Sequence, residues 1–309
     1  MFDLPPLDDV IAASLAEDLG VPAEGLLGGA ELPGLLAADV TGAAVLATDA
    51  RFRGTVVARQ AGIVCGLPAV QRAWEMLARA AGLSEAIEVF PLVAEGAAVA
   101  AGTAVLEVEG SARLVLAGER AALNLLMTLS GIATAAASWQ AEAGTALAVV
   151  DTRKTLPGLR ALSKYAVRVG GAVNHRMGLY DMVLVKDNHI RHAGGIAAAV
   201  AAARASFPDL VVEVEADTVA QAREAAIAGA DIVLLDNMDD AALTGAVAAV
   251  EGAAAESGRQ IQTEASGGIT FERLAALREA RVDRVSSSAL TLAPPLDFGL
   301  DEMKPAESD

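Results

Sequence analysis

Apolar residues recur at helical spacing in two stretches near the start of the chain. Residues 7–19 show this spacing and end at Gly20, and residues 69–81 show it again, so both stretches predict amphipathic helices. Three short stretches instead alternate or run in β-type residues with glycine at their borders, which predicts strands. These stretches are residues 44–48, 54–59 and 104–108.

Two further segments complete the first half of the pattern. Residues 21–38 are rich in Gly, Leu, Ala and Pro, and this composition predicts a loop or insertion. A long apolar pattern from about Glu119 to Ala143 predicts a long helix. The first ~110 residues are therefore expected to form a small α+β unit that the rest of the chain does not repeat.

The pattern changes after the long helix. Short apolar strands each end in a polar or charged residue, and a loop or an alanine-rich helix follows each one. We expect strands at 148–151, 183–186, 211–215, 232–236, 262–266 and 282–288. This spacing is typical of βα units, whose repetition gives a doubly wound sheet or a barrel. The barrel is favoured because a functional-looking residue ends every strand, and the chain has no G-x-G-x-x-G or Walker motif.

Composition supports a protein of the cytoplasm. The chain is 54% hydrophobic and only 3% aromatic, and it contains a single cysteine, Cys65. One cysteine forms no internal disulfide, so we expect a reducing compartment and a packed core thiol. No uninterrupted apolar run reaches the ~20 residues of a membrane span, and residues 1–6 do not resemble a signal peptide.

Charge is unevenly distributed along the chain. The net charge is −17, which argues against nucleic acid or an anionic membrane as a partner. Residues 151–192 nevertheless hold eight Lys or Arg against three Asp, a formal +5. They include all three histidines and three of the four lysines, Lys154, Lys164 and Lys186, the fourth being Lys304. We expect an anion-binding site in this region.

The predicted strand ends carry complementary chemistry. Arginine and histidine side chains bind carboxylates, Glu215 and Asp236 are suited to Mg²⁺ or ribose hydroxyls, and Gly and Ser turns offer N–H groups to phosphate. On one face of a barrel they would together bind a polyanion with carboxylates at one end and a sugar phosphate at the other.

Residues 151–190, DTRKTLPGLRALSKYAVRVGGAVNHRMGLYDMVLVKDNHI, resemble the signature of quinolinate phosphoribosyltransferases. The resemblance continues in order through EDLG, DVT, residues 95–134, VEVE, LLDN and EASGGI, and so covers most of the chain. It implies an α/β fold with an N-terminal α/β sandwich and an incomplete, seven-stranded β/α barrel. We expect the sandwich at 1–118, joined by a C-terminal tail at 292–309, and the barrel at 119–291.

The resemblance also implies roles for individual residues. Catalytic roles fall to Lys154, Lys186, Glu215 and Asp236, and the last two are expected to hold Mg²⁺ directly or through substrate or water. Arg120 is expected to reach the substrate across the interface of a homodimer. The other expected substrate contacts are Thr152, Arg153, His175, Arg176, Lys186, Ser266, Gly267, Gly268, Ser287 and Ser288.

Two departures from the family pattern bear on these expectations. Ser288 stands where the family usually has Gly in its last phosphate loop, and serine narrows the backbone angles available there. Residues 21–38 also separate EDLG from DVT by more than is usual. A surface loop tolerates such an insertion.

The expected reaction converts quinolinate and phosphoribosyl pyrophosphate (PRPP) to nicotinate mononucleotide, pyrophosphate and CO₂, a step of NAD biosynthesis. Two alternatives stay open. A related enzyme could use nicotinate or another small carboxylate acceptor, or a non-catalytic barrel could bind a sugar phosphate. The number of cationic residues fits two ring carboxylates and favours quinolinate.

Overall fold

A computed structural model describes residues 5–83 and 87–303 and divides the chain into two compact units. The first unit comprises residues 1–135, 157–170 and 293–309, and the second comprises 136–156 and 171–292. Residues 1–6, considered above for a signal peptide, lie partly outside the described residues, as does the end of the tail with Lys304. The predicted domain boundary at 118/119 stays a prediction, since helix α5 (Ala112–Ala143) runs continuously through it.

The first unit is built on an antiparallel sheet of order β12-β1-β5-β3. Its strands are β1 (Arg51–Ala58), β3 (Ile87–Pro91), β5 (Ala104–Ser111) and β12 (Phe298–Glu302), and β2 (Gly62–Ile63) pairs with β4 (Ala98–Val99). Strand β12 is antiparallel to β1, with Val56 opposite Leu300. The C-terminal segment thus completes the N-terminal sheet.

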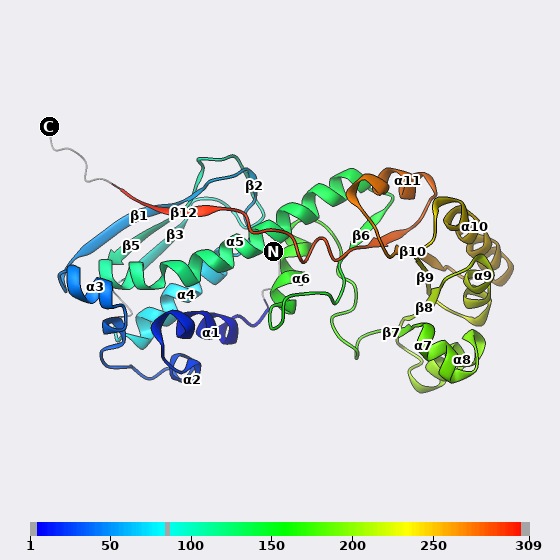
Figure 1. The fold of residues 1–309 in the computed structure, drawn as a ribbon, viewed down its shortest axis with the longest axis horizontal. Coiled ribbons are helices and arrows are strands. Elements are labelled where there is room, and N and C mark those ends of the chain that lie inside the picture. The colour runs from blue at the N-terminus through cyan, green and yellow to red at the C-terminus, as the bar shows by residue number, and fades with distance from the viewer. Residues whose placement is uncertain (1–4, 84–86, 304–309) are drawn as a thin grey trace. The chain divides into compact units, whose positions relative to one another are not determined.

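Helices α1 (Asp8–Leu19) and α4 (Leu67–Ala80) form a layer against this sheet (Figure 1). Trp74 of α4 is fully buried, and its indole N–H donates to the carbonyl oxygen of Val115 at 3.1 Å. Gly118 lies against this ring, where a Cβ atom would come within 2.7 Å of the indole. The close approach of α5 to α4 therefore requires glycine at this position.

The strand predicted at 44–48 is wrong, because the chain forms helix α3 (Val40–Val45) there. The Asp39 carboxylate accepts hydrogen bonds from the backbone N–H groups of Thr41 and Gly42. This N-cap stabilises a helix locally, and the exposed side chains of Val40 and Val45 bury no sheet face. The predicted loop at 21–38 contains two short helices, α2 (Ala23–Leu27) and η1 (Leu35–Ala37).

The second unit contains a parallel sheet of order β6-β11-β10-β9-β8-β7. Its strands are β6 (Ala148–Val150), β7 (Val183–Val185), β8 (Val212–Ala216), β9 (Ile232–Asp236), β10 (Gln262–Ser266) and β11 (Arg284–Ser286). A parallel bridge joins Val150 to Val173 beside β6, which places one further segment next to that edge. All six strands were predicted from their apolar patterns.

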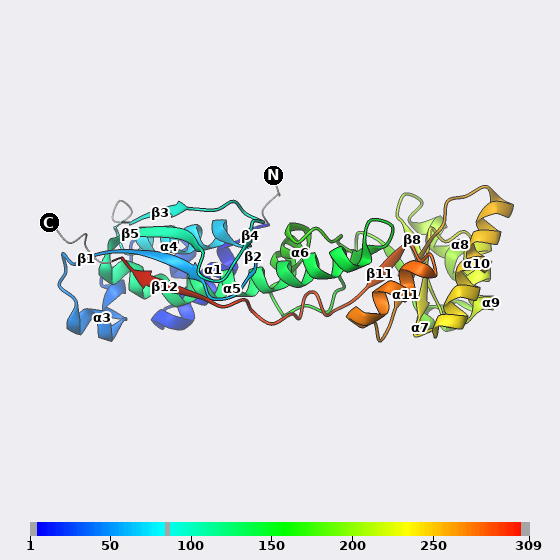
Figure 2. The same cartoon turned by 90° about the horizontal axis from the view of Figure 1, so that it is seen from above.

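Helices lie outside these strands (Figure 2). They are α7 (Asp187–Ala193), α8 (Ile196–Ser206), α9 (Val219–Ala228), α10 (Asp240–Ser257), η2 (Phe271–Arg273) and α11 (Leu274–Glu279). Every residue of β8 is buried, as expected when helices cover one face of a parallel sheet and side chains fill the other. The predicted α/β fold, an N-terminal sheet domain followed by parallel βα units, is confirmed.

Two helices remain to be placed. Helix α6 (Arg160–Val169) belongs to the first unit. Helix α5 is long and apolar enough to cross a membrane by length and composition alone, but 61% of its most apolar window is buried within the protein. Burial of this extent is what a core helix shows.

Candidate active site

A cavity of about 330 Å³ lies at the carboxyl ends of the parallel strands in the second unit. Polar side chains reach it from β10 and β11, from the segments that follow β6 and β7, and from the segment after Val173, and Leu184 and Leu234 add apolar surface. Its lining residues are Thr152, Arg153, Lys154, His175, Arg176, Leu184, Lys186, Leu234, Glu264, Ser266 and Ser286. This is the end of the strands at which β/α barrels place their active sites.

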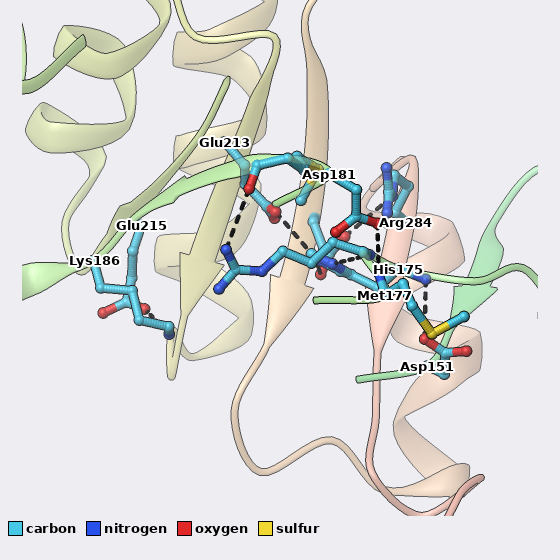
Figure 3. A network of polar contacts seen from close by, with 11 residues as sticks. Asp151, His175, Met177, Asp181, Lys186, Glu213, Glu215 and Arg284 are labelled. Carbon is cyan, nitrogen blue, oxygen red and sulfur yellow. Dashed lines mark hydrogen bonds and ion pairs between the residues drawn. The ribbon is translucent and has the colours of Figure 1, made fainter. Parts of the chain in front are cut away.

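Asp151 fastens the segment of Asn174 and His175 to the end of β6 (Figure 3). Its buried carboxylate accepts from the Asn174 side-chain amide at 2.6 Å and from the His175 backbone N–H at 3.0 Å. The Thr152 hydroxyl accepts from the Lys154 N–H at 3.0 Å, and the Lys154 carbonyl accepts from Thr291 at 2.7 Å. The segments 151–154 (DTRK) and 174–176 (NHR) are therefore held in fixed positions around the cavity.

Arg153 and Arg176 bring two guanidinium groups to this cavity. Burial lowers the pKa of Arg176, and the positive charge of Arg153 lowers it further. The buried Nε of Arg153 has no hydrogen-bond partner within the described chain. Two like charges held together with an unused donor favour a bound anion, and a guanidinium binds a carboxylate through two parallel hydrogen bonds.

Lys186 and Glu215 form a separate ion pair (Figure 3). Lys186 Nζ lies 2.5 Å from Glu215 Oε2, and the side chain of Lys186 is about half exposed while Glu215 is buried. The backbone N–H of Lys186 donates to His189 Nδ1 at 3.0 Å. His189 thus braces the start of α7 and does not line the cavity.

Three carboxylates gather beside this ion pair. Ligand oxygens of Glu215, Asp217 and Asp236 lie within 4.8 Å of one another. Burial raises the pKa of Asp236, and the negative charge of Glu215 raises it further. A hard cation would relieve this crowding, and carboxylate oxygens are the ligands that Mg²⁺ prefers. The donor set fits the expected Mg²⁺.

Asn237 connects this acidic group to the Gly267–Gly268 turn. Its side-chain amide donates to Asp236 at 2.7 Å, and its backbone N–H donates to the Ser266 carbonyl at 2.9 Å. Its φ of 52° is in the left-handed region, which is unusual for a residue other than glycine. A Cβ atom on Gly267 would overlap the Asn237 amide, so glycine is required there.

The last strand ends in three serines, which the structure separates by role. Ser286 lines the cavity. The Ser287 hydroxyl accepts from the Ala289 N–H at 3.2 Å. Among the described residues other than glycine, only Asn237 and Arg281 have positive φ, so Ser288 occupies its position without left-handed strain. The concern that serine would distort this turn is removed.

A buried charged cluster lies below the cavity, and the sequence had pointed to two of its members, His175 as a substrate contact and Glu213 within the family segment VEVE. Glu213 and Glu264 are both fully buried, and His175 Nε2 lies 3.0 Å from Glu213 Oε2 and 3.5 Å from Glu264 Oε1. Arg284 Nε lies 3.1 Å from Glu264 Oε2. Glu264 and Arg284 sit in ordinary-looking strands, and the only sequence signal was Glu264 within the family segment EASGGI.

The structure brings together most of the predicted site residues of the second unit. Seven of them line the cavity: Thr152, Arg153, Lys154, His175, Arg176, Lys186 and Ser266. Glu215 contacts Lys186, and the contacts of Asn237 link Asp236 to Gly267. Gly268, Ser287 and Ser288 continue the turns after β10 and β11.

Two of the cationic residues considered above belong to the first unit. Lys164, counted with the predicted anion-binding cluster, is fully buried in α6 of the first unit, and its place in that cluster stays a prediction. Helix α6 has a buried face that includes it. Arg120 of α5 also belongs to the first unit, with its side chain 58% exposed, and its predicted role across a dimer interface stays a prediction.

Family models match both halves of the chain. The model described as quinolinate phosphoribosyl transferase, C-terminal domain, matches residues 132–301, and the corresponding N-terminal domain model matches residues 39–130. Together these matches span most of the sequence in the expected order.

Curated relatives and solved structures agree with these matches. The chain is 42% identical over 247 residues to a probable nicotinate-nucleotide pyrophosphorylase [carboxylating] of Synechocystis, covering 79% of this chain and 80% of that protein. The human nicotinate-nucleotide pyrophosphorylase [carboxylating] is 44% identical over 67% of this chain and 70% of its own length. The nicotinate-nucleotide pyrophosphorylase structure from Francisella tularensis has a TM-score of 0.82 at 32% identity, covering 98% of this chain and all of that one.

Proposed function

This chain belongs to the quinolinate phosphoribosyltransferase family, and on that premise we propose that its cavity joins quinolinate to PRPP. The products are nicotinate mononucleotide, pyrophosphate and CO₂, as in carboxylating nicotinate-nucleotide pyrophosphorylases, and the protein is a pentosyltransferase of NAD biosynthesis. The observation that supports the proposal best is the pair of guanidinium groups facing one cavity beside a separate group of carboxylates.

The pyridine dicarboxylate binds at the cationic side of the cavity. Arg153 and Arg176 bind its two carboxylates, and Thr152, Lys154 and His175 line the same wall. Because these groups are held by Asp151 and by backbone contacts, they place the ring nitrogen without further rearrangement. Such positioning supplies roughly 7–11 kcal/mol of the barrier in favourable cases.

PRPP binds across the ends of β8 to β11. Backbone N–H groups of the Gly267–Gly268 turn and the segment of Ser287 and Ser288 bind its 5′-phosphate, with Ser266 beside them. Glu215 and Asp236 hold the ribose hydroxyls and Mg²⁺, and Asp217 is close enough to join them. When bound, Mg²⁺ supplies positive charge that stabilises the leaving pyrophosphate.

The reaction then needs little proton transfer. The bond between the ribose C1 and pyrophosphate breaks, positive charge develops on C1, and the pyridine nitrogen attacks it. The ring nitrogen becomes cationic and stabilises the electron pair that stays on the ring carbon when the adjacent carboxylate leaves as CO₂, and that carbon then takes up a proton from solvent. Fixed positive charge from Arg153, Arg176, Lys154 and Lys186 stabilises the negative groups throughout, and the Lys186–Glu215 ion pair holds Lys186 at the junction of the two substrates.

The finer assignments are also proposals. The protein acts in the cytoplasm as a homodimer in which Arg120 of one subunit reaches the cavity of the other. The side chain of Arg120 is 58% exposed, and this exposure supports the role. Mixing inactive Arg120→Ala and Lys186→Ala variants tests it: subunit exchange restores activity if the site is shared, and an active monomer in light scattering contradicts it.

An assay of carboxyl-labelled quinolinate with PRPP and Mg²⁺, following release of CO₂, tests the function as a whole. We expect turnover that depends on both substrates. Turnover of nicotinate but not quinolinate would identify a related enzyme for a monocarboxylate acceptor. Binding of PRPP without turnover of either acid would identify a non-catalytic sugar-phosphate-binding barrel.

A further inference from the structure

Two fully buried carboxylates face each other beneath the cavity, and the established chemistry of phosphoribosyl transfer does not require them. Glu213 is on β8 and Glu264 is on β10, with β9 between them. In a β/α barrel, side chains from alternate strands fill the same interior layer. This arrangement brings the oxygens of both carboxylates and a ring nitrogen of His175 within 4.8 Å of one another.

The hydrogen bonds of His175 fix the position of its proton. The backbone N–H of Arg176 donates to His175 Nδ1 at 2.8 Å, so Nδ1 accepts and carries no proton. The proton is then on Nε2, which points to Glu213 Oε2 at 3.0 Å (Figure 3). The same nitrogen lies 3.5 Å from Glu264 Oε1, so His175 faces both carboxylates.

The charges around the pair come from a small number of groups. Arg284 lies beside Glu264, the Arg176 charge attracts Glu213, and Asp181 and Arg153 act on Arg176 in turn. Ser286 offers a hydroxyl to Glu264. Two buried negative charges are therefore balanced by Arg284 and Arg176 as long as Arg176 has no other partner.

Substrate binding changes this balance. A ring carboxylate bound to Arg176 adds a negative charge, and Arg284 alone then faces two buried carboxylates. No carboxylate oxygen of Glu213 or Glu264 has a hydrogen bond of good geometry within the described chain. An uncompensated buried charge is expensive, and such groups usually neutralise by binding a proton.

We propose that Glu264 takes up a proton when the carboxylate substrate binds at Arg176, which makes Glu264 a positioning residue for the acceptor site. The inference rests on the proposed function. The protonated Glu264 can then donate a hydrogen bond to the Glu213 carboxylate, which faces His175 Nε2 at 3.0 Å. The pair then carries one negative charge, matched by Arg284, and leaves Arg176 to the substrate.

The proton affinity of Glu264 suits this role. Burial, followed by the negative charge of Glu213, raises the pKa of Glu264 to about 7, while His175, Arg284 and Ser286 oppose the rise. Below pH 7 the proton is already present and binding takes up none. Above pH 7 the free protein lacks it, so binding takes up about one proton, and quinolinate affinity falls roughly tenfold for each further pH unit.

Proton uptake on the wild-type protein tests the proposal directly. Quinolinate is titrated into the protein by calorimetry at pH 6 and pH 8.5, each in two buffers of different ionisation enthalpy, and its KM is measured at the same pH values. We expect uptake of about one proton at pH 8.5 and almost none at pH 6. The carboxylates of quinolinate stay ionised over this range and contribute no proton change of their own.

Glu264→Gln isolates the residue, because its neutral amide imitates the protonated acid. We expect this variant to lose proton uptake at pH 8.5 and to show a KM for quinolinate that no longer rises between pH 6 and pH 8.5. A residue that only supports the fold would raise KM at every pH. Glu279→Gln, on the exposed side of α11, makes the same substitution away from the cavity and should behave like wild type.

The outcomes separate the two proposals. Wild-type turnover of quinolinate without proton uptake at pH 8.5, or uptake that persists in Glu264→Gln, overturns the role of Glu264 and leaves the proposed function standing. Absence of both binding and turnover with quinolinate overturns the two together. The wild-type measurement decides the matter even if the variant fails to fold.

Discussion

A cavity lies at each end of the parallel strands in the second unit. The charged groups at the two ends differ in how completely they are hydrogen-bonded. The cavity at the amino ends is the larger, about 440 Å³ against about 330 Å³, and it is also lined by arginines and carboxylates, including Arg278, Arg281, Glu251 and Asp283. Cavity size and composition alone would therefore not distinguish the ends.

The hydrogen bonds and ion pairs of the charged groups do distinguish the amino ends from the carboxyl ends. At the amino ends, Asp231 accepts from the Val212 N–H and pairs with Arg204 and Arg259. Asp283 accepts from both the N–H and the hydroxyl of Thr263 at 2.7 and 2.9 Å. In the cavity at the carboxyl ends, Arg153 and Glu264 keep buried polar atoms without hydrogen bonds within the described chain, and Glu213 does so in the cluster below it. Unused polar capacity is what a ligand would fill.

The largest expected effect comes from removing an arginine from each of the two cavities in turn. Arg176→Ala should lower kcat/KM for quinolinate roughly 30- to 1,000-fold, because loss of a charged partner for a carboxylate costs about 2–4 kcal/mol. Arg278→Ala removes an arginine from the other cavity and should change kcat/KM less than about twofold. Steady-state kinetics with quinolinate and PRPP measures both, and equal losses would show that the amino ends also serve catalysis.

The next effect concerns stability. Asp231→Ala leaves two arginines and the Val212 N–H without their shared acceptor, so the free energy of unfolding should fall by about 2 kcal/mol with kcat/KM unchanged. Glu256→Ala breaks only the exposed pair with Arg223 and should cost less than about 0.5 kcal/mol. Urea unfolding at fixed protein concentration checks both. A loss of turnover in folded Asp231→Ala would contradict the division between the ends.

The smallest effect compares the two left-handed residues other than glycine, Asn237 at the carboxyl ends and Arg281 at the amino ends. Glycine adopts their backbone angles freely, so Asn237→Gly and Arg281→Gly should each change the free energy of unfolding by less than about 1 kcal/mol. Only Asn237→Gly should raise the KM for PRPP, by roughly tenfold, since Asp236 and the Gly267 turn lose their link. An equal rise in the KM for PRPP in Arg281→Gly would contradict a functional role for the left-handed backbone of Asn237.

The fold followed closely from local patterns, and its exceptions have local causes. Apolar runs of three to five residues separated by alanine-rich helices are sufficient to indicate parallel strands, since such strands are buried on both faces. The strand expected at 44–48 does not form, although the composition there is β-type. The Asp39 side chain caps a helix instead, and Val45 is exposed and buries no sheet face. Propensity is a weak guide where no sheet face is buried.

The sequence by itself determined which kinds of residue the cavity would contain. The segments 151–154 (DTRK), 174–176 (NHR) and 186–189 (KDNH) bring arginine, histidine and lysine to strand ends whatever the details of packing. Only the tertiary structure decided that Lys164 is buried in the first unit, and that Glu264, two strands away from Glu213, shares its interior layer. Their side chains meet across the intervening strand β9 of the parallel sheet, and this proximity in space leaves no mark on the spacing of residues along the chain.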